Sequence, residues 1–192
     1  KELSAMLSDS IPLNLERAVF LIENAYLGNT MKYSDFQNEI GERVQYCQWR
    51  LNDLKLDSDD ELAKNMAIFS LLTDTLSINQ PGSEKTIVHY PLKYNLDDYD
   101  SQRDYTSHFV SSMLHSNMGQ CYSMPLLYLV MAERMGAEAY LSYAPKHMFI
   151  KIKNDKGAWY NLELTCRSVL SDYHYMNGSY IKSCLLYTSP SP

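Results

Sequence analysis

Residues 119–136, GQCYSMPLLYLVMAERMG, predict an amphipathic helix whose start is fixed by a proline. Proline lacks an amide proton and fits a helix only in its first turn, so Pro125 requires the helix to begin at or just after Cys121. Gly136 suits the end of the helix. The predicted apolar face consists of residues at helical spacing: Met124, Leu127, Tyr128, Met131 and Met135.

Cys121 therefore lies at the positive end of a helix dipole, a position that favours the thiolate form of a cysteine. The alternative is a buried structural cysteine, because cysteine is among the residues most often found in protein cores. Gly119 is predicted to let the backbone approach a substrate closely. A base and an orienting carboxylate near Cys121 would favour the first of these two interpretations.

Length and composition predict an ordinary globular chain with one domain-sized core. The chain has 192 residues, of which 45% are hydrophobic and 21% charged. A net charge of −6 argues against a general nucleic-acid-binding role. The longest strongly apolar run, residues 124–132, is too short to span a membrane.

The order of predicted elements favours an α+β fold. Residues 1–78 read as helices, and Ser58 and Glu61 have the spacing of a capping box before one of them. An apolar stripe in the first predicted long helix consists of Leu15, Ala18, Val19, Ile22 and Tyr26. Residues 79–183 contain strand-like segments around one helix and end in a predicted antiparallel meander, which argues against a parallel α/β sheet.

The tail at residues 184–192, CLLYTSPSP, resembles a translated sequencing adapter. We expect this segment to be foreign to the natural protein and its removal to leave folding unchanged.

The three remaining cysteines, Cys47, Cys121 and Cys166, do not form a disulfide framework. The chain has no CxxC pair, and its acidic run at residues 97–104 lacks the glycine and glutamate of a calcium loop. The sequence therefore predicts neither a metal site nor a cofactor.

A predicted hairpin supplies Cys121 with a base and an orienting carboxylate. Residues 147–153 and 158–165 both alternate apolar and polar side chains, and Gly157 suits a three-residue turn that places Asn154 opposite Ala158. This register makes His147 and Glu163 diagonal neighbours on one face of the sheet, within reach of each other. Asn161 on the same face is the substitute for Glu163, because thiol enzymes can use an asparagine there.

The three elements together resemble the transglutaminase-like superfamily, relatives of the papain-like thiol enzymes. GQC opens an apolar helix, APKHMFIKI follows, and Trp159, Glu163 and Thr165 match the W-x-x-x-D-x-T pattern over a resemblance that spans about residues 105–165. Glu163 replaces the usual Asp, and Met148 follows His147 where an aromatic residue is common. The resemblance implies a papain-like core with Cys121 as nucleophile, His147 as base and Glu163 as orienter.

These residues predict a thiol-dependent hydrolase or acyltransferase that acts on amide or peptide bonds of a peptide or protein substrate. Hydrolysis is favoured because no feature marks an amine-binding site. The Cys121 amide is expected to donate to the oxyanion, with a second donor to be chosen from His115, Asn117 and Gln120. The alternative function is a non-catalytic protein- or peptide-binding module that keeps the fold.

Overall fold

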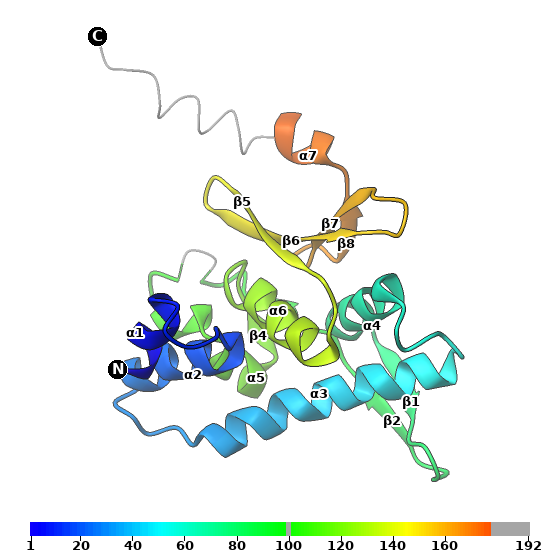
Figure 1. The fold of residues 1–192 in the computed structure, drawn as a ribbon, viewed down its shortest axis with the longest axis horizontal. Helices are drawn as coiled ribbons and strands as arrows, with labels where there is room; N and C mark the ends of the chain where they lie inside the picture. Colours follow the sequence, from blue (N-terminus) through cyan, green and yellow to red (C-terminus); the bar gives the residue numbers. More distant parts are fainter. Residues whose placement is uncertain (99–100, 178–192) are drawn as a thin grey trace.

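A computed structural model describes residues 1–98 and 101–177, so the tail at 184–192 lies outside the described residues. Figure 1 shows the N-terminal helices beside and below a central helix, with a sheet above it. The helices are α1 (Glu2–Leu7), α2 (Leu15–Tyr26), α3 (Tyr33–Asp53), α4 (Glu61–Thr73), η1 (Tyr105–His108, a 3-10 helix), α5 (Val110–Ser116), α6 (Ser123–Met135) and α7 (Asp172–Asn177).

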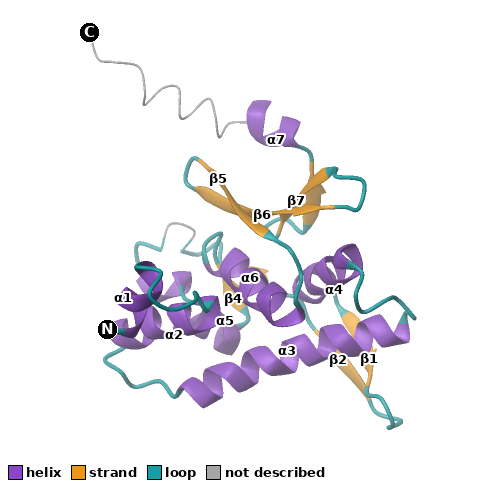
Figure 2. Ribbon diagram, viewed as in Figure 1, coloured by secondary structure: helices purple, strands orange, loops and turns teal. Residues whose placement is uncertain are grey.

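The strands form three small sheets in the described part of the chain (Figure 2). β1 (Leu76–Asn79) pairs antiparallel with β2 (Thr86–His89), and β3 (Lys93–Tyr94) pairs parallel with β4 (Met118–Gly119). The largest sheet is an antiparallel meander of β5 (Tyr140–Ala144), β6 (His147–Lys153), β7 (Trp159–Glu163) and β8 (Ser168–Leu170). The predicted α+β class is confirmed.

The predicted register of the β6–β7 hairpin is also confirmed. Ile150 pairs with Leu162, and the Asn154 amide donates to the Ala158 carbonyl at 3.0 Å. Gly157 has a φ of 79°, a left-handed conformation that glycine adopts at no steric cost, so it closes the turn as expected.

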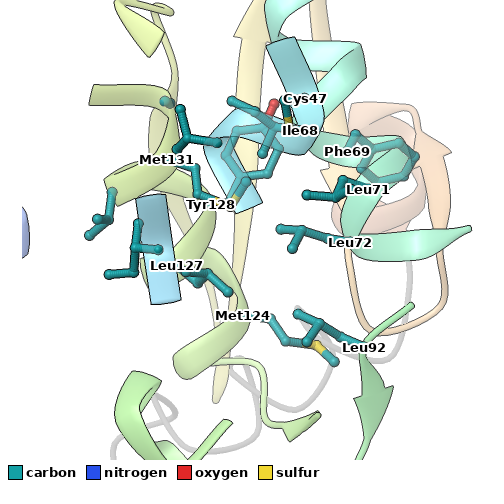
Figure 3. Packing of buried hydrophobic residues seen from close by; sticks show 14 of the residues in the cluster. Cys47, Ile68, Phe69, Leu71, Leu72, Leu92, Met124, Leu127, Tyr128 and Met131 are labelled. Carbon is teal, nitrogen blue, oxygen red and sulfur yellow. The ribbon is translucent and has the colours of Figure 1, made fainter. Parts of the chain in front are cut away.

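Helix α6 is the centre of the hydrophobic core (Figure 3). Its predicted apolar residues Met124, Leu127, Tyr128 and Met131 are each at most 1% exposed. The Tyr128 hydroxyl donates to the Asn65 side-chain oxygen at 2.8 Å, which satisfies the one polar atom that this side chain buries. The N-terminal helices and the sheet pack on α6 in one continuous core, so the helix start is held from both sides.

Candidate functional site

Helix α6 begins at Ser123, just after Cys121 as predicted, and Cys121 lies in the turn that leads into the helix. The Met124 amide donates to the Gln120 carbonyl at 3.0 Å, and this bond closes a turn around Cys121 before the regular helix begins at Ser123. The Ser123 hydroxyl accepts from the Gln120 amide at 2.9 Å and fixes this turn. Pro125 lies in the first turn of α6, where its missing donor costs no helical hydrogen bond.

Cys121 is 7% exposed but is not part of the hydrophobic core cluster. Its Sγ lies 3.9 Å from the Lys146 carbonyl, so the residue that precedes β6 touches the start of α6. The next residue, His147, is close enough for the thiol to contribute to the raised pKa of its imidazole. The structure therefore brings together the cysteine and the histidine that the sequence predicted.

His147 links Cys121 to Glu163. Its Nε2 lies 2.5 Å from Glu163 Oε2, and Cys121 contributes to the raised pKa of the same ring. Burial disfavours the charged ring, but the hydrogen bonds with Cys121 and Glu163 outweigh it and raise the pKa of His147 to about 9. The imidazole is therefore protonated at neutral pH.

Glu163 is held by four hydrogen bonds. Oε1 accepts from the Thr165 amide at 3.1 Å and the Thr165 hydroxyl at 2.6 Å, and Oε2 accepts from His147 and from the Tyr175 hydroxyl at 2.9 Å. Burial disfavours the carboxylate, but the bonds to His147 and Thr165 outweigh it and lower the pKa of Glu163. A threonine two residues after the carboxylate thus has a physical role: it fixes the oxygen that does not face the imidazole.

Tyr175 is a site residue that the sequence analysis missed. It belongs to α7, which lies on the side of the sheet opposite α6 (Figure 1). Its ring stacks on Phe149 with centroids 4.0 Å apart and planes 9° apart. In this position its hydroxyl donates a hydrogen bond to Glu163. A six-residue helix is too short for its residue spacing to predict that one of its tyrosines contacts the β6–β7 hairpin.

Asn161, the alternative orienter, is bonded elsewhere. Its Nδ2 donates to the Leu170 carbonyl at 3.1 Å and to Asp172 Oδ1 at 2.8 Å. Lys151 also pairs with Asp172, at 2.9 Å. Glu163 is the residue that bonds His147.

The three side chains considered as second oxyanion donors each bond elsewhere: His115 to Glu39, Asn117 to the Pro91 carbonyl, and Gln120 to the carbonyls of Asn95 and Asp98. By contrast, no acceptor for the Cys121 amide is found among residues 1–98 and 101–177. The Cys121 amide, in the turn before α6, is thus available as a hydrogen-bond donor.

Gly119 is tightly packed where the chain enters α6. It is buried, and a Cβ at this position would lie 2.3 Å from Met113 Sδ and 3.0 Å from Ser123 Oγ. Met113 is itself fully buried, so it has little room to move. The absence of a side chain at Gly119 lets the chain enter α6 between these two residues.

Gly119→Ala is expected to destabilise the protein by about 1–3 kcal/mol, because overpacking of a filled core is unfavourable. Gly41→Ala is the control, since the nearest atom to its Cβ is the end of the Arg134 side chain and alanine favours the interior of α3 by about 1 kcal/mol. Chemical denaturation measures both changes. A Gly119→Ala protein as stable as the parent would contradict this packing role.

The other two described cysteines have different surroundings. Cys47 lies in the core within α3, where burial raises the pKa of its thiol. Cys166 is exposed and lies after β7. Neither environment combines a helix start with a neighbouring imidazole, which is the combination that Cys121 has.

None of the helices in the described part of the chain has the length and apolar character needed to cross a membrane. Comparison of the chain with protein-family models, curated proteins and solved structures gives no match. Functional assignment therefore depends on the geometry around Cys121.

Proposed function

We propose that this protein is a thiol-dependent hydrolase of amide or peptide bonds, of the transglutaminase-like type. The observation that carries the proposal is the placement of Cys121 against the start of β6, beside a His147 that is hydrogen-bonded to Glu163. A nucleophile, a base and an orienter of the base in contact are the arrangement that covalent thiol catalysis needs.

In the proposed reaction, the Cys121 thiolate attacks the substrate carbonyl carbon, and the carbonyl π electrons move to oxygen. The Cys121 amide donates to that oxyanion. His147 gives its proton to the leaving nitrogen as the carbon–nitrogen bond breaks, which leaves a thioester. Water then loses a proton to His147 and attacks the thioester, and Cys121 leaves as a thiolate.

Glu163 keeps the imidazole in one orientation throughout this cycle. Its four hydrogen bonds fix the carboxylate, and its negative charge stabilises the imidazolium that pairs with the thiolate. Glutamate in place of aspartate is compatible with this role, because the longer side chain still places Oε2 at 2.5 Å from Nε2.

The proposal predicts hydrolysis of fluorogenic peptide amides that falls as pH rises through about 9. His147 has a raised pKa, so its proton is present below that value and is lost above it, and protonation of the leaving nitrogen is lost with it. Cys121→Ala should abolish the signal at every pH. A signal that survives in Cys121→Ala would contradict the proposal, and incorporation of a labelled primary amine in place of hydrolysis would indicate an acyltransferase.

A further inference from the structure

One part of the apolar stripe on α2 is left uncovered by the core. Ala18 and Val19 are buried as predicted, but Ile22 is 54% exposed and Tyr26 is 59% exposed. These two side chains face a group of aromatic rings from the segment around η1: Tyr26 lies 5.7 Å from Tyr105, centroid to centroid. The exposed end of α2 is therefore one wall of an apolar surface.

The other wall includes the residue that follows the candidate nucleophile in the chain. The His108 ring lies 5.2 Å from Tyr105 and 4.7 Å from Tyr122, and Tyr122 is the residue after Cys121. A cavity of about 410 Å³ lies between these walls, within the range of about 300–1,000 Å³ that ligand pockets occupy. It is lined mainly by Ile22, Tyr105, His108, Phe109, Tyr122 and Leu126.

The charged group at this cavity is already satisfied. Glu23 is 4% exposed, and its two oxygens accept from the amides of Val110 at 2.7 Å and Ser111 at 2.9 Å. Burial raises the pKa of Glu23 and lowers the pKa of His108, so both groups are shifted toward their neutral forms. The cavity therefore offers apolar and aromatic contacts and no free charge to a ligand.

We propose that this cavity is a specificity pocket for a large apolar or aromatic side chain on the substrate residue whose carbonyl Cys121 attacks. The inference rests on the proposed function and names its substrate class. Tyr122 lines the cavity and is the residue after Cys121, so the cavity begins one residue from the candidate nucleophile. Helix α2 then contributes to specificity, although it lies outside the region of family resemblance.

The test compares alkylation of Cys121 by chloromethyl ketones of acetylated phenylalanine, glycine and lysine, each rate divided by the rate of the same probe with free cysteine. We expect the phenylalanine probe to exceed the glycine probe by roughly ten- to a hundredfold, as expected for an apolar pocket. Ile22→Asp should remove most of this preference. Leu54→Asp, at an apolar residue with 49% exposure at the end of α3, should leave it unchanged.

Failure of the pocket and failure of the enzyme are separable in this experiment. The ratio of phenylalanine to glycine probe reports on the pocket even when the thiol is not activated, whereas the rate with iodoacetamide reports on activation alone. A ratio near one, a preference for lysine, or equal effects of Ile22→Asp and Leu54→Asp would overturn the proposed pocket. An unchanged iodoacetamide rate in Ile22→Asp shows that the variant is folded around Cys121.

Discussion

Replacement of His147 by alanine is expected to slow alkylation of Cys121 by iodoacetamide at pH 6 by about a hundredfold. An ordinary cysteine has a thiolate fraction of only about 0.3% at this pH, whereas a thiol paired with an imidazolium keeps its thiolate. The structure places Cys121 beside a His147 whose pKa is raised to about 9, so removal of the ring removes a positive charge next to the thiol.

His115→Ala is the matched control for this measurement. His115 has an exposed side chain and pairs with Glu39 on α3, so its loss should leave the alkylation rate of Cys121 unchanged. Peptide mapping by mass spectrometry assigns each rate to its cysteine. Equal rates in the parent, His147→Ala and His115→Ala proteins would mean that the imidazole does not activate the thiol.

Glu163→Ala is expected to destabilise the protein by about 3–5 kcal/mol, because it leaves a buried imidazolium without its counter-charge. It also removes the acceptor of Thr165 and Tyr175. For a chain of this length the change corresponds to a fall in melting temperature of roughly 6–20 °C. The same variant should slow alkylation of Cys121, since His147 loses the partner that helps to keep it protonated.

Glu2→Ala is the control for stability, because Glu2 forms an ion pair with Arg17 at the surface, and such pairs contribute little to the free energy of unfolding. Thermal unfolding of the three proteins gives the comparison. If Glu163→Ala and Glu2→Ala melt at the same temperature, the carboxylate is not the buried anchor of His147 that the hydrogen bonds indicate.

The hairpin and the helix start could be predicted because their determinants are local in sequence. Apolar alternation with Gly157 at the turn leaves one register, and that register makes His147 a neighbour of Glu163. Pro125 fixes the start of α6 in the same way, through the one position that lacks a donor. The positions of Cys121, His147 and Glu163 could therefore be predicted from rules that involve only residues near each of them in the sequence.

Features that depend on distant segments could not be predicted. Tyr175 reaches Glu163 because α7 folds back over the sheet, and Gly119 is needed because Met113 fills the space beside it. The exposed Ile22 and Tyr26 looked like core residues, since spacing alone does not show where a neighbouring helix stops covering a stripe.

The helix α4 start shows a competition between two local signals. The sequence predicted a capping box from Ser58 to Glu61, but this is wrong: Asp60 is the N-cap, and its carboxylate accepts from the amides of Leu62 and Ala63. A carboxylate one residue before the helix satisfies two amides at once, which the serine two residues further out cannot do. The helix therefore begins at Glu61.

The most direct test of the account is competitive labelling of the intact protein with limiting iodoacetamide at pH 6, followed by quantification of each cysteine by mass spectrometry. We expect Cys121 to be modified about a hundredfold faster than the exposed Cys166, although Cys121 is only 7% exposed. Cys47 should stay unmodified because it is fully buried. Modification of Cys166 at the same rate as Cys121, or faster, would contradict an activated thiol at the start of α6.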